Sequence, residues 1–447
     1  MKKLLVVSND EVGSQMAGPG IRYYHFAREL SKSYDVALVV PTVPETSLGN
    51  FDVLKASDWR GRRFRSLVRT RDVVIAQTLR AWTMNQLALA DVRVIYDLYD
   101  PALIGNLDFN TGEDVSGLYR RVAFRAPTLL QEIALRTGNA FVCASERQRD
   151  YWLGMLGAVG RIDPDAAADD PSFRDLIEVV PFGLESAAPV ATKRVLKGVV
   201  RGIRETDKVL LWGGGIWNWL DPLTPIRALS VISQKRDDVK LFFLGVNRPN
   251  PGVRQLAMTA RAVELAKDLG LYDRFVFFNF GWVPYAERAN YLLEADLGIS
   301  SHLDTLETRF SFRTRLLDYF WAGLPPVATQ GDVLSEVVEG RNLGRTVRVR
   351  RVEDWTHSIE ELLDDSAEWA RVRRNVEEAR EDFTWPKVVD PLARLAARPG
   401  RVITKPRSGA MMSARYGVLA FGKVLLRGGV LEGLREAYQV LRRPPVP

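Results

Sequence analysis

Short apolar runs recur through the first 180 residues of the chain, separated by helix-length segments of mixed polarity. Between residues 21 and 31, Tyr24, Ala27 and Leu30 lie on one apolar stripe with helical spacing. Runs that are apolar throughout suit strands buried on both faces. Their alternation with helices predicts a doubly wound parallel sheet. The strands are expected at residues 3–8, 36–40, 73–76, 92–96 and 140–144.

The same alternation starts again in the second half of the chain. Its predicted strands are residues 209–212, 240–245, 275–278, 295–300 and 326–329. A length of 447 residues with 46% hydrophobic residues can fill two cores. We therefore expect an α/β protein with two Rossmann-like domains, residues 1–190 and 191–385, and a basic helical tail at residues 401–447.

The segment from Ser300 to Glu336 carries the strongest functional signal. It indicates a loop, a helix capped by Ser311, a glycine stop, a buried strand and a second helix. On one helix, Ser311, Arg315 and Asp318 have the spacing i, i+4, i+7 and span about 10 Å. A ribose and its diphosphate are separated by a similar distance. Asp318 can accept hydrogen bonds from ribose hydroxyls, while the helix start receives phosphate.

Three arginines, Arg309, Arg313 and Arg315, crowd the start of this expected helix. Cations oppose the helix dipole there unless an anion intervenes. A diphosphate would be such an anion, so the cluster predicts a nucleotide-sugar donor site. The alternative is an ordinary αβ unit in which the arginines and Asp318 are solvated surface charges.

A glycine-rich turn, GGGIWNWLDP, follows the first strand of the second domain. The backbone amides of Gly214 and Gly215 can cradle phosphate oxygens. Trp217, with Trp219, can stack on a sugar or a base. The competing interpretation places both tryptophans in the core.

In the first domain, loops after three strands should line one edge of the sheet. Gly18 and Gly20 allow a ligand to approach the backbone, and Arg22 either contacts phosphate or is exposed. Asp97 and Asp100 follow a strand in the sequence IYDLYDP. They are candidates to take a proton from an acceptor hydroxyl or to orient it, or they cap the turn before the next proline.

The sequence DYFWAGLPPVAT, beginning at Asp318, resembles the E-A-M-A-x-G-x-P-V-V-A-T signature of the family 4 glycosyltransferases. Asp318 falls on the second Glu of the family's E-x7-E motif, and Glu336 matches a Glu after its glycine loop. The resemblance implies the GT-B fold, with two domains facing across a cleft and a helix at residues 386–400 returning to the first. It further implies retaining, nucleotide-sugar-dependent transfer of a hexose-type sugar to a glycan or lipid-linked acceptor.

The chain departs from the family pattern at three places. Phe310 stands where the first Glu is expected, so the sugar-binding carboxylate is missing or is supplied by Glu307. Many family members have a histidine near the end of the strand at residues 92–96, where this chain has Asp97 and Asp100 and no histidine. The glycine loop lacks the family's basic residue, so we expect the arginines at 309, 313 and 315 to neutralise the diphosphate. Trp282 lies in GWVP, where the resemblance places a loop that contacts the base.

Metal and nucleic acid are both disfavoured as partners. The histidines His25, His302 and His357 are scattered and Cys143 has no second cysteine, so no metal site is expected and no cofactor is predicted. Residues 401–447 carry nine basic and two acidic residues, a formal +7 that equals the charge of the whole chain. The residues before the tail are therefore formally neutral. The basic pI arises from the tail and does not indicate that the two domains bind nucleic acid.

The sequence predicts a cytoplasmic protein. It has no run of the roughly 18–20 apolar residues that cross a bilayer, and no signal-peptide core. The tail suits an interfacial helix on anionic lipid, which would place the protein on the inner face of the cytoplasmic membrane, or it packs on the body. Six arginines between Arg60 and Arg71 can meet a lipid headgroup or an acceptor pyrophosphate, or remain solvated.

Two alternative functions stay open at this point. A nucleotide-sugar epimerase of the same fold would convert the donor without an acceptor. A catalytically silent nucleotide-sugar or glycan-binding protein would account for the three departures. The favoured prediction is a metal-independent glycosyltransferase of cell-surface polysaccharide or glycolipid assembly.

Overall fold

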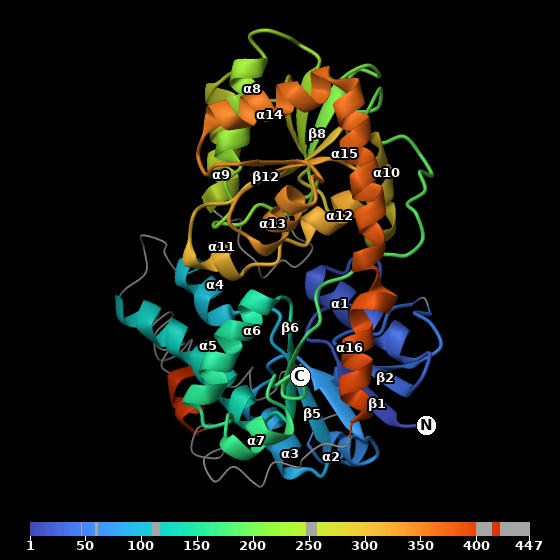
Figure 1. Cartoon of the computed structure of the whole chain (residues 1–447), viewed down its shortest axis with the longest axis vertical. Helices are drawn as coiled ribbons and strands as arrows, with labels where there is room; N and C mark the ends of the chain where they lie inside the picture. The colour runs from blue at the N-terminus through green and yellow to red at the C-terminus, as the bar shows by residue number, and fades with distance from the viewer. Residues whose placement is uncertain (46, 59–60, 110–116, 247–256, 399–413, 421–447) are drawn as a thin grey trace. The chain divides into compact units, whose positions relative to one another are not determined.

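A computed structural model describes residues 1–447 except 46, 59–60, 110–116, 247–256, 399–413 and 421–447. The chain forms two compact units, Met1–Pro181 with Val388–Pro447, and Phe182–Lys387 (Figure 1). Most of the basic tail therefore lies outside the described residues. Within it, residues 414–420 are helical, and Tyr416 packs against the core of the first unit.

The first unit contains a parallel sheet whose seven described strands have the order β3-β2-β1-β4-β5-β6-β7. Strand β1, inside the sheet, pairs with β2 and β4, so that Leu5 lies opposite Ala37 and Val74, all three fully buried. The strands are β1 (Lys3–Val7), β2 (Asp35–Val40), β3 (Asp52–Lys55), β4 (Val73–Ala76), β5 (Arg93–Asp97), β6 (Ala140–Cys143) and β7 (Ile177–Val179).

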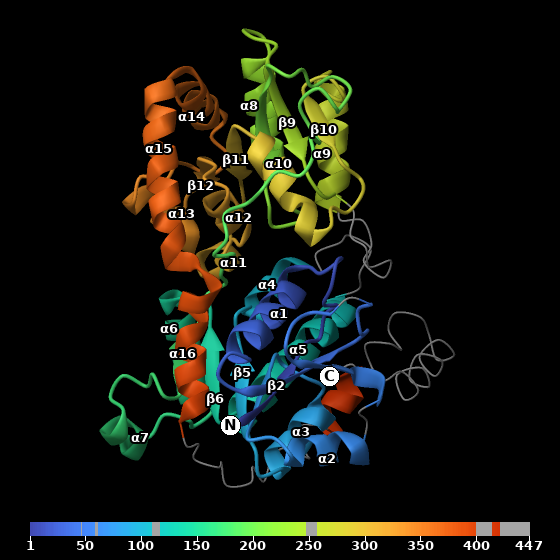
Figure 2. The same ribbon diagram turned by 90° about the vertical axis from the view of Figure 1, so that its right-hand side faces the viewer.

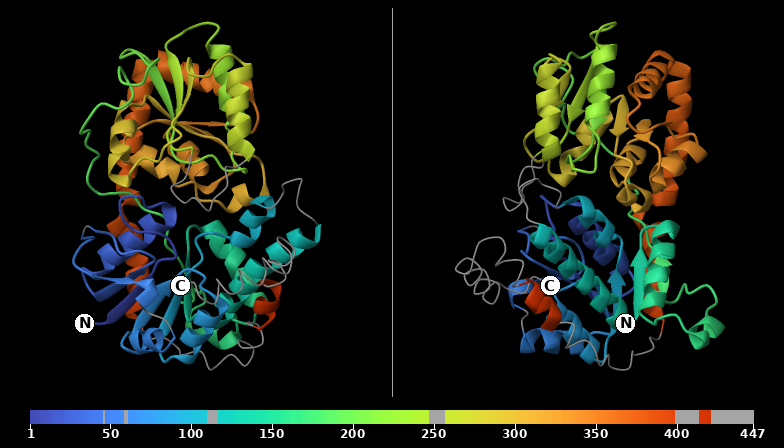
Figure 3. Two further views of the ribbon diagram at one scale, coloured as in Figure 1. Left: turned by 180° about the vertical axis from the view of Figure 1, so that it is seen from behind. Right: turned by 90° about the vertical axis from the view of Figure 1, so that its left-hand side faces the viewer.

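Helices lie on both faces of this sheet and complete its core (Figure 3). Trp152 is fully buried, and its Nε1 donates to Leu98 O at 3.0 Å. The helices are α1 (Gly18–Leu30), α2 (Arg62–Arg69), α3 (Ala81–Leu89), α4 (Ala102–Phe109), α5 (Gly117–Thr137), α6 (Glu146–Ala158) and α7 (Pro164–Asp169), with a short 3-10 turn η1 (Ala56–Asp58).

The second unit contains a parallel sheet whose six described strands have the order β10-β9-β8-β11-β12-β13. The chain runs outward from β8 in one direction and from β11 in the other, so the order reverses between these neighbours. Ligands of open α/β sheets bind beyond the carboxyl ends of the strands at such a reversal. The strands are β8 (Lys208–Trp212), β9 (Val239–Phe243), β10 (Val276–Phe278), β11 (Leu297–Ser300), β12 (Pro326–Thr329) and β13 (Arg345–Val347).

Figure 2 separates the half of this unit built on β8 to β10 from the half built on β11 to β13. Helix α14 packs on α8, which joins the two halves. The helical elements are α8 (Leu223–Ile232), α9 (Ala257–Asp268), η2 (Tyr285–Glu287), α10 (Arg288–Glu294), α11 (Leu306–Phe310), α12 (Arg315–Trp321), α13 (Val333–Gly340), α14 (Val352–Asp364), α15 (Ser366–Ala379) and η3 (Arg380–Phe383).

The last long helix, α16 (Trp385–Ala397), begins in the second unit and continues in the first. At its start, Trp385 N donates to Leu184 O at 2.9 Å. Farther along, the Tyr34 hydroxyl donates to Ala393 O at 3.0 Å and Lys2 Nζ donates to Ala397 O at 2.6 Å. Contacts within the first unit therefore hold the helix from Val388 onward.

The predicted α/β class with two parallel sheets is confirmed. The ten predicted strands all form, within one or two residues of the expected bounds. Three strands were not predicted, and each lies at a sheet edge: β3, β7 and β13. They are three or four residues long and only partly buried, so their sequences lack the continuous apolar run that marks a central strand.

Candidate functional site

The reversal between β8 and β11 brings the glycine-rich turn next to helix α12. The Tyr319 hydroxyl accepts a hydrogen bond from Gly213 N at 2.9 Å. It also lies 2.9 Å from Leu211 O and 2.8 Å from Ile299 O, and donates to one of them. Burial raises the pKa of Tyr319 to about 12, so the hydroxyl keeps its proton at neutral pH. One side chain thus fixes α12, both central strands and the turn.

Gly214 is the point at which the turn changes direction. Its φ of +89° is a backbone conformation that residues with a side chain rarely adopt. No heavy atom lies within 4 Å of the position that a Cβ would occupy there. The next residue, Gly215, uses its carbonyl oxygen to accept a hydrogen bond from Arg315 Nη2 at 3.0 Å. The turn therefore presents open backbone beside a guanidinium.

Arg315 supplies the only cation hydrogen-bonded to this turn within the described residues. Its guanidinium carbon lies 4.4 Å from the centroid of the Trp212 ring. Its Nη1 is buried and has no hydrogen-bond partner in the described part of the chain. Burial lowers the pKa of Arg315 to about 10, so the side chain remains charged at neutral pH. A phosphate oxygen would satisfy both the free donor and the charge.

The structure contradicts the prediction that Ser311 caps the helix carrying Asp318. Ser311 instead ends α11, where its hydroxyl donates to Thr308 O at 2.9 Å, and α12 begins only at Arg315 after Thr314. Two short helices replace the single expected one. The shared helix face is therefore restricted to Arg315 and Asp318, which have the spacing i, i+3.

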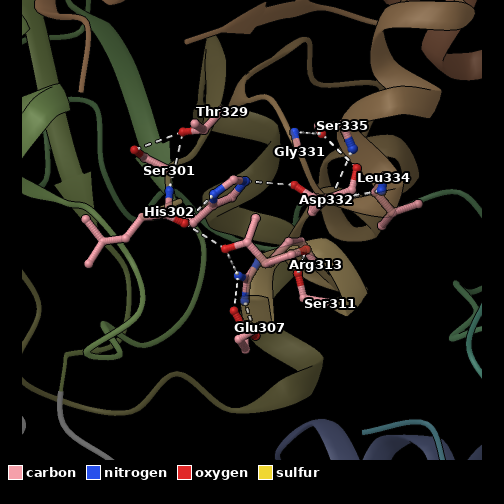
Figure 4. A network of polar contacts seen from close by, with 12 residues as sticks. Ser301, His302, Glu307, Ser311, Arg313, Thr329, Gly331, Asp332, Leu334 and Ser335 are labelled. Carbon is pink, nitrogen blue, oxygen red and sulfur yellow. Dashed lines mark hydrogen bonds and ion pairs between the residues drawn. The ribbon is translucent and has the colours of Figure 1, made fainter. Parts of the chain in front are cut away.

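Glu307 and Arg313 form a two-pronged ion pair in the loop before α12 (Figure 4). The nitrogen–oxygen distances are 3.0 Å for Nη1 to Oε1 and 2.6 Å for Nη2 to Oε2. The side chains are 8% and 14% exposed. Each charge is thus already neutralised, which argues against Arg313 on the diphosphate and against Glu307 as a free sugar-binding carboxylate. Arg309 is exposed on α11.

A buried network around His302 holds this loop against the start of α13 (Figure 4). His302 Nε2 lies 3.1 Å from Asp332 Oδ2, and Asp332 Oδ1 accepts hydrogen bonds from Leu334 N and Ser335 N at 2.8 and 3.1 Å. On the other side, His302 Nδ1 lies 3.2 Å from Leu303 O. Asp332, the partner of His302, was not identified from the sequence.

Asp318 faces Arg288, whose Nε lies 3.2 Å from its Oδ1. Burial raises the pKa of Asp318 above its usual range, and Arg288 opposes that rise. Because the side chain is 43% exposed, solvent limits this rise. An exposed carboxylate next to the phosphate-binding turn suits the predicted contact with a ribose.

Three tryptophans follow strands of this sheet. The Trp217 and Trp219 rings stack with centroids 4.8 Å apart and an angle of 11° between their planes, and both are half-buried. Trp282 is half-buried near Gly245, and its Nε1 has no hydrogen-bond partner among the described residues. Their predicted sugar-stacking and base-binding roles stay predictions.

Comparisons with known proteins agree with this geometry. Residues 207–365, which include the turn, α12 and α13, match a family described as glycosyl transferases group 1. A D-inositol 3-phosphate glycosyltransferase of Gordonia bronchialis is 24% identical over 220 residues, which cover 48% of this chain and 46% of that protein. The chain thus spans about half the length of this curated relative.

Solved structures of similar fold cover nearly the whole chain. Sucrose-phosphate synthase from Thermosynechococcus elongatus has a TM-score of 0.61 at 15% identity, covering 88% of this chain and 98% of its own. HepE of Anabaena, in a complex with UDP and glucose, has a TM-score of 0.60 at 14% identity, covering 88% and 99%. These likenesses show the GT-B fold.

Residues 207–365 are thus similar to the glycosyl transferases group 1, and the chain as a whole has the GT-B fold.

In the first unit, Arg22 and Asp97 are paired with each other in the interior. Arg22 Nε and Nη2 donate to Asp97 at 2.7 and 3.0 Å, and Nη1 and Nη2 donate to the carbonyl oxygens of Pro181 and Val180 at 2.9 and 2.8 Å. Both side chains are fully buried. Since every Arg22 nitrogen has a partner, the phosphate contact is wrong, and Asp97 is committed to the ion pair rather than free to take a proton.

Two predicted glycines of this unit lie within α1 rather than in a loop. A Cβ at Gly20 would overlap the carbonyl oxygen of Glu11, so this glycine serves close packing inside the protein and not the approach of a ligand. Gly18 begins the helix and has open space around it. Asp100 is exposed just before α4, and its predicted role toward an acceptor stays open.

Sequence reasoning missed three residues that organise the candidate site from other elements, namely Arg288, Tyr319 and Asp332. Gly298 was the available signal for Tyr319, because a Cβ at Gly298 would overlap the Tyr319 ring. A glycine within a buried strand indicates close approach of another group, but its partner is 21 positions away and cannot be identified by spacing.

The described residues of the candidate site include charged side chains but form no metal-ligand group. In the described part of the chain, no three His, Cys, Asp or Glu side chains are grouped so that they could hold a metal ion. A search of the same residues for a helix long and apolar enough to cross a membrane finds none.

Proposed function

We propose that this protein transfers a hexose-type sugar from a nucleotide-sugar donor to an acceptor hydroxyl, with retention of the anomeric configuration. The observation that carries the proposal is Arg315, whose buried and unpartnered Nη1 lies beside the open glycine turn. A donor diphosphate supplies the missing acceptor atoms. Solved complexes of HepE with UDP and with UDP-glucose support a nucleotide-sugar ligand for this fold.

The donor would lie across the ends of β8 and β11. The amides of Gly214 and Gly215, together with Arg315, bind the diphosphate, and Asp318 accepts hydrogen bonds from the ribose. Trp282 covers the base, while Trp217 stacks on the sugar. This assignment uses one arginine where the sequence suggested three, since Arg313 is paired with Glu307.

In the proposed reaction, the bond between the anomeric carbon and the diphosphate oxygen breaks as the acceptor oxygen bonds to the same carbon from the same face. The acceptor proton passes to the departing diphosphate. Arg315 and the turn amides stabilise the negative charge that develops on the leaving group, so the reaction is proposed to need no metal. Asp100 is the remaining candidate for orienting the acceptor hydroxyl.

The acceptor is proposed to be a glycan or a lipid-linked molecule at the inner face of the cytoplasmic membrane, in polysaccharide or glycolipid assembly. Helix α2 supports an anionic partner. Arg62, Arg63, Arg65 and Arg69 are exposed on it, whereas its apolar residues face the core. No ion pair to these four arginines occurs within the described residues. Arg60, the first of the predicted cluster, lies outside them.

A two-stage experiment tests the function. Thermal unfolding is measured with UDP, GDP, dTDP, ADP and their common sugar conjugates in the presence of EDTA, and a shift with one nucleotide identifies the donor series. Turnover is then followed as release of that nucleoside diphosphate with candidate acceptors. Epimerised donor without release would indicate an epimerase. Binding without any turnover would indicate a silent binding protein.

A further inference from the structure

Arg288, at the start of α10, is fixed from several sides. Its guanidinium carbon lies 3.6 Å from the centroid of the Tyr285 ring and 4.3 Å from that of the Trp321 ring. Its Nη1 donates to Tyr285 O at 2.8 Å, and its side chain is only 12% exposed. Trp321 is itself fixed, because its Nε1 donates to Ala187 O at 2.7 Å. The guanidinium therefore has one well-defined position.

The remaining Arg288 contact is with Asp318. The Arg288 Nε donates to Asp318 Oδ1 at 3.2 Å, and the described residues make no hydrogen bond to Asp318 Oδ2. The carboxylate is thus held by one oxygen and is open at the other, on a side chain that is 43% exposed. Asp318 and Trp321 are one helical turn apart on α12, so the ring and the carboxylate approach Arg288 from the same helix.

We propose that Arg288 is a positioning residue for the donor's ribose: it fixes Oδ1 of Asp318 so that Oδ2 is presented to the ribose hydroxyls. This inference rests on the proposed nucleotide-sugar function. An aspartate side chain can adopt several rotamers, and only some of them direct its carboxylate at a ligand. A second side chain that fixes its orientation lowers the entropy lost when the ribose binds.

The arrangement gives selectivity for ribonucleotides. A carboxylate oxygen that is already oriented forms a charge-assisted hydrogen bond with a ribose hydroxyl, and a deoxyribose cannot form that bond. Hydrogen bonds to charged groups correspond to about a 10- to 100-fold change in affinity. Without Arg288, the carboxylate can turn toward water, and ribose and deoxyribose should bind more equally.

The test measures dissociation constants by calorimetry for UDP, 2′-deoxy-UDP and 3′-deoxy-UDP, and for the corresponding adenosine and guanosine diphosphates. For the wild-type protein and the base that it binds, we expect at least one of the two deoxyribose diphosphates to bind about tenfold or more weakly than the ribose form. In Arg288→Gln, that ratio should fall to within about twofold of unity. Arg288→Lys retains the charge and should keep part of the ratio. Arg348→Gln removes an exposed, ion-paired arginine of the same unit and should leave the ratio unchanged.

The outcomes separate this inference from the function on which it rests. If none of the diphosphates binds the wild-type protein, the proposed donor site is overturned. If a diphosphate binds and Arg288→Gln keeps the wild-type ratio while remaining folded, only the role of Arg288 is wrong. A uniform loss of affinity for ribose and deoxyribose forms would likewise overturn it, because that pattern indicates general damage to the site.

A pH profile gives a second readout that a purely structural role would not change. Within the described residues, Arg288 is the charged group that neighbouring elements bring to Asp318, and it favours the ionised carboxylate. Its removal raises the pKa of Asp318. Binding that needs the carboxylate is then lost at a higher pH as the solution is acidified. We expect the pH midpoint of UDP affinity to move upward in Arg288→Gln and to stay in place in Arg348→Gln.

Discussion

The Arg22 guanidinium and the Asp97 carboxylate form a two-pronged ion pair inside the first unit, with nitrogen–oxygen distances of 2.7 and 3.0 Å and both side chains fully buried. The arginine also lies over the Phe26 and Tyr99 rings, at 4.5 and 5.1 Å from their centroids. It joins α1 to the end of β5 and to the last residues before the second unit. Two residues that sequence analysis assigned to chemistry therefore have a structural role.

Removing one partner of this pair should destabilise the protein strongly. Arg22→Met leaves the Asp97 carboxylate buried without its cation, and we expect the free energy of unfolding to fall by about 3–5 kcal/mol. Chemical denaturation that follows the unfolding of the first unit measures the loss in this free energy. The double variant Arg22→Met/Asp97→Leu should recover part of it, because no buried charge remains. A change below about 1 kcal/mol in the single variant would contradict the structural role.

Arg315→Gln should weaken nucleoside diphosphate binding. The substitution removes a charge-assisted contact that contributes about 1.5–3 kcal/mol, a loss of roughly 10- to 100-fold in affinity. Calorimetry with UDP, GDP and ADP measures the effect, and uridine and the other nucleosides without phosphate provide the comparison. Nucleoside affinity should change little. Arg309→Gln, which removes an exposed arginine of the same segment, serves as the matched control.

Trp217→Ala should reduce affinity for a sugar nucleotide more than for the bare nucleotide. The stacked Trp217 and Trp219 rings form a flat apolar surface beside the glycine turn, and stacking on such a ring contributes about 0.5–1.5 kcal/mol beyond area burial. The measured quantity is the ratio of dissociation constants for UDP-glucose and UDP, or for the series that the screen selects. Equal losses for both ligands would place the ring against the core or the nucleotide instead.

Neutralising α2 should reduce binding to anionic membranes. The variant replaces Arg62, Arg63, Arg65 and Arg69 with glutamine, and each basic residue near an anionic surface contributes about 1 kcal/mol. Sedimentation with vesicles containing phosphatidylglycerol measures the affinity, and phosphatidylcholine vesicles give the background. The control replaces four exposed arginines that have carboxylate partners in the second unit, namely Arg194, Arg348, Arg371 and Arg373. Equal binding of both variants would remove α2 from the proposed membrane surface.

Local sequence determined the buried strands of both sheets and the fold class. The buried strands of both sheets are continuous apolar runs, and such runs are visible without knowledge of their partners. Gly214 and Gly323, the glycine stop expected after the helix of Asp318, could also be predicted, because a positive φ at a turn favours glycine whatever surrounds it. Arg315 and Asp318 were placed together by helical spacing, which depends only on local geometry.

Tertiary structure decided which side chains are free to act. Arg22 and Asp97 are 75 positions apart, Arg288 and Asp318 are 30 apart, and His302 and Asp332 are also 30 apart. Such pairs form because the fold brings helices and strand ends that are distant in the chain next to one another, and sequence spacing carries no record of which of them meet. A charged residue in a loop therefore has the same sequence signature whether it binds a ligand or a buried partner, and only the folded arrangement distinguishes the two.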